Sequence, residues 1–210
     1  MGEATDDICH HVKWKVVVLQ RVRKFYGIAD IVTLWRSDIL SFIEYRTPAI
    51  YHAVNVRLGQ VDRLQDSFLK DLGLSPLDSL VHFKLAPLSC RRDMALLGLI
   101  HRSVLGLGPP QFHEFVRPPW RWRVRQTVRQ RHRFHLEDSI DGRHLNLFRD
   151  SVFGLMRVYN LLDPEIVEAQ SVANFQAKLQ QLLLSRACAG CMDWRDTFSP
   201  RVAMYEHPLR

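Results

Sequence analysis

The residues with the clearest chemical potential are arginines and tryptophans that interleave in one short stretch. Between Arg117 and His135 the sequence holds seven arginines and no acid, which gives this stretch a charge of +7. Guanidinium groups bind phosphates in a bidentate manner, and tryptophan rings stack on unpaired bases or on neighbouring guanidinium groups. The pattern therefore indicates contact with nucleic acid. The candidate residues are Arg117, Trp120, Arg121, Trp122, Arg123, Arg125, Arg129, Arg131 and Arg133.

A second basic stretch lies near the N-terminus. His10 to Tyr26 carries a charge of +5 and no acid, while the rest of the chain holds 17 basic and 22 acidic residues. Positive charge concentrated in two stretches of an otherwise acidic chain indicates a surface for a polyanion. In the alternative interpretation both stretches are solvated faces. Trp120 and Trp122 would then anchor the arginine-rich stretch to the core while its arginines face water. The candidate residues are Lys13, Lys15, Arg21, Arg23 and Lys24.

Residues suited to catalysis or metal binding do not form a recognisable set. The sequence has no glycine-rich phosphate loop, no His-Glu-x-x-His motif and no nucleophile elbow. Cys188 and Cys191 have the spacing of a metal-binding pair but lack two further ligands nearby, and His101 lies on an apolar stripe, as a core histidine does. Asp6 and Asp7 follow no apolar strand, and we expect them in a solvated leader. The sequence therefore predicts no catalytic centre, no metal and no cofactor.

Helices are the elements that would position these residues, because apolar residues recur at helical spacing through most of the chain. The first apolar stripe comprises Trp14, Val17, Val18, Val22 and Phe25. The second comprises Ile31, Leu34, Trp35, Ile39, Phe42 and Ile43. The third comprises Leu58, Val61, Leu64, Gln65, Phe68 and Leu72. Gly73 supplies a left-handed end for the third helix, and Ser75-Pro76 is typical of a new helix start.

The arginine–tryptophan stretch departs from this helical spacing. Trp120 to Arg125 alternates with a period of two, which is typical of a strand, so a hairpin is one interpretation. A basic extended loop that is ordered only by its ligand is the other. The predicted fold class is therefore mostly α, an irregular bundle of about six to eight helices with a basic extended loop or short hairpin near 117–135.

Several short motifs resemble one family in a shared order. They are Leu40–His52, Asp62–Gln65, Phe68–Gly73, Leu85–Ser89, Arg91–Ala95, Gly154–Asn160 and Ser171–Gln176. In this order they are similar to the thumb and post-thumb region of reverse transcriptases from non-LTR, Jockey-like (LINE-type) retrotransposons. The resemblance spans roughly Val12 to Arg201.

The resemblance implies a nucleic-acid-binding part of an RNA-directed DNA polymerase without its fingers and palm. Thumb helices are expected to pack along a template–primer duplex, so Lys13, Lys15, Arg21, Arg23 and the later arginine cluster would contact phosphates. The carboxylates that bind Mg²⁺ in this family belong to the palm, which this chain lacks. We therefore expect no bound Mg²⁺ and no enzyme activity from this chain alone. The predicted organisation is a disordered leader (1–11), a thumb-like helical region (12–116), a basic loop or hairpin (117–143), a C-terminal helical region (144–190) and a tail (191–210).

Two alternatives stay open: a stand-alone helical module that binds a protein or RNA, and a non-functional relic of a mobile element. The expected partner is nucleic acid (RNA, DNA or a hybrid) and not a membrane, because no apolar run reaches the length of a membrane span. With no secretory signal at the N-terminus, we expect an intracellular location, nuclear or cytoplasmic. Self-association is expected if the face of Leu34, Trp35, Phe42 and Ile43 is exposed.

Overall fold

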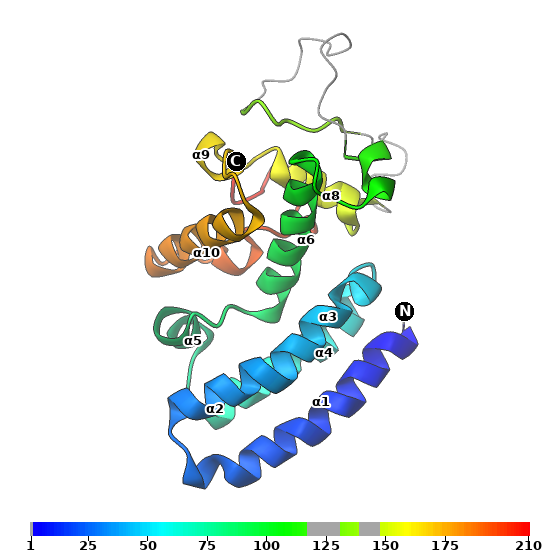
Figure 1. The fold of residues 1–210 in the computed structure, drawn as a ribbon. Helices are drawn as coiled ribbons and strands as arrows, with labels where there is room; N and C mark the ends of the chain where they lie inside the picture. Colours follow the sequence, from blue (N-terminus) through cyan, green and yellow to red (C-terminus); the bar gives the residue numbers. More distant parts are fainter. Residues whose placement is uncertain (1, 117–130, 139–147) are drawn as a thin grey trace. The chain divides into compact units, whose positions relative to one another are not determined.

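The computed structural model describes residues 2–116, 131–138 and 148–210 (Figure 1). Within these ranges the chain is mostly helical and has no β-strand, which confirms the predicted all-α class. None of the helices in these ranges combines the length and the apolar character that a membrane span requires. The chain divides into two compact units, residues 1–92 and residues 93–210.

The first unit is built from long helices. In chain order its elements are α1 (Gly2–Val22), the 3₁₀ turn η1 (Arg23–Phe25), α2 (Ile28–Leu34), η2 (Trp35–Leu40), α3 (Ser41–Ile50), α4 (Asn55–Asp71) and α5 (Pro76–Phe83). α2, η2 and α3 form one continuous helical run, in which η2 is a π-helical segment. α1 runs antiparallel to this run and packs against both α3 and α4 (Figure 1).

The core of the first unit lies between these helices. Trp35 stacks on Phe68 of α4 with ring centroids 4.1 Å apart, and Trp35 and Ile43 are fully buried. Leu34 and Phe42 pack against the same core and are half-buried. The condition given for self-association, exposure of this face, is therefore not met, because the face packs in the core of the first unit.

The sequence prediction is also wrong about which face of α1 is buried. The buried side comprises Thr5, Ile8, Cys9, Val12, Val16 and Leu19. Most of the predicted stripe faces solvent instead, with Trp14 71% and Phe25 73% exposed, and only Val22 of this stripe packs against the core. Both faces of this helix carry apolar residues at helical spacing, so spacing alone does not select the face that packs on the neighbouring helices.

Of the predicted disordered leader, residues 2–11 are helical instead, since α1 begins at Gly2. Asp6 accepts a hydrogen bond from Arg57 at 2.8 Å, and Asp7 accepts one from Arg46. The Arg46 guanidinium lowers the pKa of the Asp7 carboxyl. The acid pair therefore ties α1 to α3 and α4, and the prediction of a solvated leader is wrong.

The helix predicted from Leu58 to Leu72 is confirmed as α4, and the next helix also begins where predicted. Gly73 adopts a left-handed conformation at the end of α4, with φ of +71°. The Ser75 hydroxyl accepts a hydrogen bond from the backbone N–H of Asp78 at 3.0 Å, and the Asp78 carboxylate accepts one from the Ser75 N–H at 3.1 Å. This reciprocal capping box explains why α5 starts at Pro76.

The second unit is built from shorter helices. α6 (Leu88–Val104) begins in the first unit, and it is followed by η3 (Pro110–Glu114), α8 (Val152–Tyr159), α9 (Pro164–Val167), α10 (Val172–Cys188) and η5 (Trp194–Asp196). With residues 28–50 taken as one run, the described ranges hold eight α-helical runs, as the predicted bundle allows. Residues 191–210 are not a detached tail, because Phe198 and His207 are buried.

The basic loop or hairpin predicted near 117–135 lies mostly outside the described residues. The described part, residues 131–138, forms a bend and a turn and not a strand. Leu136 holds it to α8, because its N–H donates to Asn160 Oδ1 at 2.7 Å and its carbonyl accepts from Asn160 Nδ2 at 2.9 Å. This segment is thus fixed by paired side-chain hydrogen bonds to the backbone.

Candidate nucleic-acid interface

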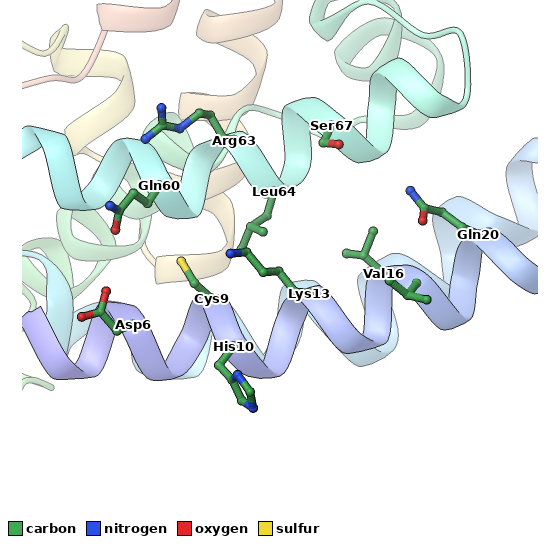
Figure 2. A pocket seen from close by; sticks show the side chains of 11 residues that line it. Asp6, Cys9, His10, Lys13, Val16, Gln20, Gln60, Arg63, Leu64 and Ser67 are labelled. Carbon is green, nitrogen blue, oxygen red and sulfur yellow. The ribbon is translucent and has the colours of Figure 1, made fainter.

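A groove lies between α1 and α4 in the first unit (Figure 2). Its volume is about 850 Å³. Apolar packing between the two helices forms its floor, and polar side chains border it. The lining residues are Asp6, Cys9, His10, Lys13, Val16, Val17, Gln20, Gln60, Arg63, Leu64 and Ser67.

Two cations border this groove. Lys13 extends from α1 toward α4, and Arg63 lies on α4 with its Nε donating to the Gly59 carbonyl at 3.1 Å (Figure 2). Burial raises the pKa of the Cys9 thiol, while the positive charges of Lys13 and Arg63 oppose that rise. Neither cation forms an ion pair with any residue that the structure describes. Both charges are therefore open to an external anion.

The five predicted basic residues of the N-terminal stretch do not form one surface. Lys15 Nζ lies 2.5 Å from Asp38 Oδ1 and also donates to the Asp38 carbonyl, so α2–α3 already supplies its partner. Arg23 donates to the Asp71 carbonyl at the end of α4. Arg21 is exposed, and Lys24 lies 5.0 Å from the centre of the Phe25 ring. Of the predicted set, three residues face solvent and have neither an acid nor a backbone carbonyl as partner in the described ranges: Lys13, Arg21 and Lys24.

Most of the predicted arginine–tryptophan cluster lies outside the described residues. These positions are Arg117, Trp120, Arg121, Trp122, Arg123, Arg125 and Arg129. Arg131 and Arg133 are described, and both have partners within the protein. Arg131 donates to the carbonyls of Leu161 at 2.8 Å, Leu209 at 2.7 Å and Arg210 at 3.1 Å.

Arg133 differs from Arg131 in how firmly it is held. Its Nε lies 3.7 Å from Glu168 Oε1, and the side chain is 63% exposed. The guanidinium also lies over the Phe134 ring, 4.7 Å from its centre. Arg131 is therefore a structural residue in this fold, whereas Arg133 keeps an exposed guanidinium.

Sequence reasoning missed Arg63 and the groove itself. Arg63 lies outside the apolar stripe of its helix, and its position in the sequence does not reveal what lies beside it in the fold. The groove depends on the register of α1, and that register was misassigned. Counting Thr5 and Cys9 as apolar would have extended the stripe of Ile8, Val12 and Val16, and would have placed Lys13 beside α4.

His101 in the second unit is a core histidine, as predicted. Its Nε2–H donates to the Ala169 carbonyl at 2.9 Å, and its Nδ1 accepts from the Tyr159 hydroxyl at 3.0 Å. Its ring stacks on Phe175 with centroids 4.1 Å apart. Burial lowers the pKa of His101 and raises that of Tyr159. With both ring nitrogens occupied, this cluster stabilises the fold and offers no free base.

The cysteine pair near the end of α10 gathers no further ligands. Cys188 is exposed, Cys191 is half-buried and both are free thiols. Among residues 2–116, 131–138 and 148–210, no group of three histidines, cysteines or acids is placed to hold a metal ion.

Known proteins give no independent assignment of this site. No family model, no curated protein and no solved structure matches the chain. The resemblance to non-LTR reverse transcriptases therefore stays a prediction from sequence motifs. The groove and the exposed cations of α1 are what the structure itself contributes to an assignment.

Proposed function

We propose that the chain binds nucleic acid through backbone phosphates, as the thumb-like part of a non-LTR retrotransposon RNA-directed DNA polymerase that lacks its palm. One observation carries the proposal: Lys13 and Arg63 border a single groove, and no described acid neutralises either of them. The motif resemblance supports the polymerase context. The chain's formal charge of +7 agrees with a polyanionic partner.

The spacing of the exposed cations suits a phosphate chain. Lys13 and Lys24 are eleven residues apart, which is roughly 16 Å along a helix. One strand of a duplex carries a phosphate about every 3.4 Å along its axis, so this length corresponds to about four or five phosphates. Asp6, at one end of the groove, is already engaged by Arg57 at 2.8 Å and adds little repulsion. Such contacts read the backbone and not the base sequence.

Salt-dependent binding of oligonucleotides tests this function. Fluorescence anisotropy of a labelled 20-base-pair duplex, between about 50 and 200 mM salt, should give a linear fall of log affinity with log salt. Lys13→Gln and Arg63→Gln should each weaken binding and reduce the slope by roughly 0.7–0.9 for each lost phosphate contact. Lys15→Gln is the matched control, because Asp38 already occupies Lys15.

Two results would contradict the proposal. The first is no binding of duplex or single strand at low salt. The second is a salt slope that stays the same in Lys13→Gln and Arg63→Gln. A primer-extension assay with Mg²⁺ tests the polymerase context separately: the chain alone should incorporate no nucleotides, and template-dependent incorporation would show that it holds a catalytic centre.

A further inference from the structure

The outward side of α1 exposes rings that a helical unit ordinarily buries. Trp14 is 71% exposed, Phe25 is 73% exposed and Tyr26 is 53% exposed. Trp14, Val17, Val18 and Arg21 follow the spacing of one helix face, and Phe25 continues it one turn later. We call Trp14, Val17, Val18, Arg21 and Phe25 the α1 outer face. The opposite side of the helix supplies the buried residues that join the core, and Trp14, Arg21 and Phe25 stay exposed.

Two cations accompany these rings. Lys24 precedes Phe25 with its Nζ 5.0 Å from the centre of that ring. Arg21 lies between the two rings on the face itself and is exposed. No acid occurs from His10 to Tyr26, and neither Arg21 nor Lys24 forms an ion pair with a residue that the structure describes.

We propose that the α1 outer face binds single-stranded nucleic acid, with bases stacked on Trp14 and Phe25 and phosphates held by Arg21 and Lys24. This inference rests on the proposed function and narrows its ligand class. Aromatic side chains stack on any unpaired base, because every base has a flat π face. In a duplex the base faces are hidden in the stack, so a duplex gains from the cations alone. Exposed rings between cations therefore favour single strands over duplexes.

Other occupants fit this face less well. A second copy of the chain, related by a two-fold axis, would bring the same cations together and be repelled. An acidic protein helix would match the charge, but such helices pack best on aliphatic ridges, and Val17 and Val18 are only 42% and 37% exposed. The most exposed groups are the flat rings, which suit bases.

The test compares one single strand with one duplex. The probes are fluorescein-labelled (dT)12 and the 12-base-pair dA·dT duplex, at one low salt concentration and with the full chain. Trp14→Ala and Phe25→Ala should each weaken (dT)12 binding at least about fivefold while leaving the duplex affinity within about twofold. Tyr45→Ala is the matched control, because Tyr45 is an aromatic residue 87% exposed on α3, and it should change neither affinity.

A second measurement reads stacking directly. A (dT)12 that carries 2-aminopurine at its centre should lose fluorescence on binding, and Trp14→Ala should restore much of it. Unchanged (dT)12 affinity and unchanged quenching in Trp14→Ala and Phe25→Ala would overturn the inference while leaving phosphate binding intact. Equal losses for strand and duplex would also overturn it. If these variants lose affinity only for poly-glutamate, the face docks an acidic protein instead. No binding of either oligonucleotide by the unaltered chain would refute the proposed function itself.

Discussion

The two basic stretches of the chain place similar side chains in opposite settings. Arg131, in the second unit, donates to three backbone carbonyls, and those carbonyls belong to Leu161 and to the last two residues of the chain. On α1 of the first unit, Lys13 and Arg21 are exposed and have no acidic partner among the described residues. A run of positive charge therefore does not reveal which cations are available to a ligand. The acceptors that folding brings near each cation decide that.

Other polar groups of the second unit also have hydrogen-bond partners within the protein, and unlike the exposed Arg131 they are buried. His101 is fully buried and bonded through both ring nitrogens, and His132 donates from Nε2 to the Tyr159 carbonyl at 3.1 Å. The hydrogen bonds of these two histidines stabilise the unit because they satisfy polar atoms in its interior. We therefore expect substitutions of inward polar groups to change stability, and substitutions of the outward cations on α1 to change ligand binding.

The largest expected effect is that of removing an inward histidine. His101→Leu should lower the free energy of unfolding by about 2–4 kcal/mol, because it leaves the Tyr159 hydroxyl and the Ala169 carbonyl buried without their partner. His52→Leu, at an exposed position in the first unit, should change it by less than about 0.5 kcal/mol. Urea denaturation followed by circular dichroism measures both, and equal effects would remove the distinction between the units.

The second-largest expected effect is a loss of stability of the second unit at acidic pH. Burial lowers the pKa of His101, of His132 and of His207. These side chains are therefore neutral in the folded chain under conditions where the unfolded chain binds protons, near pH 6.5 and below. Their contribution to stability is present above that pH and is lost as the pH falls. The Tm should decrease from pH 7.5 to pH 5.5, and a Tm that rises over this range would contradict the expectation.

Arg131 and Arg21 should differ in how much each contributes to stability. Arg131→Ala should lower the free energy of unfolding by about 0.5–1.5 kcal/mol, because it removes hydrogen bonds to the carbonyls of Leu161 and Leu209 that are exposed and are partly replaced by water. Arg21→Ala should change it by less than about 0.5 kcal/mol. The same urea titration tests both, and a larger loss for Arg21→Ala would reverse the proposed division of roles.

The smallest expected effect concerns two lysines of one helix. Lys15→Gln should lower the free energy of unfolding by at most about 0.5 kcal/mol, because its pair with Asp38 is partly exposed and screened by solvent. Lys13→Gln should leave it unchanged. A double-mutant cycle with Asp38→Asn measures the interaction energy between Lys15 and Asp38. An interaction energy of zero would show that Asp38 does not stabilise Lys15, so that Lys15 is as available to a ligand as Lys13.

Local signals in the sequence predicted the elements that depend on neighbours along the chain. The helix from Leu58 to Leu72 follows from spacing and from a terminal glycine, and α5 follows from the Ser75 cap. The core position of His101 follows from its place on an apolar stripe. The buried face of α1 did not follow, because that helix carries apolar residues on both sides and only its contacts with α3 and α4 select one.

The sequence by itself determined that the chain is mostly helical and that its positive charge is concentrated in two stretches. Only the tertiary structure decided which cations stay open. Asp38, Asp71 and the Leu161 carbonyl lie more than twenty residues from the side chains they bind. Periodicity reports contacts within about one turn of a helix, so it carries no information on acceptors that distant. Lys13 and Arg21 remain exposed, and no described acid lies within ion-pair distance of either.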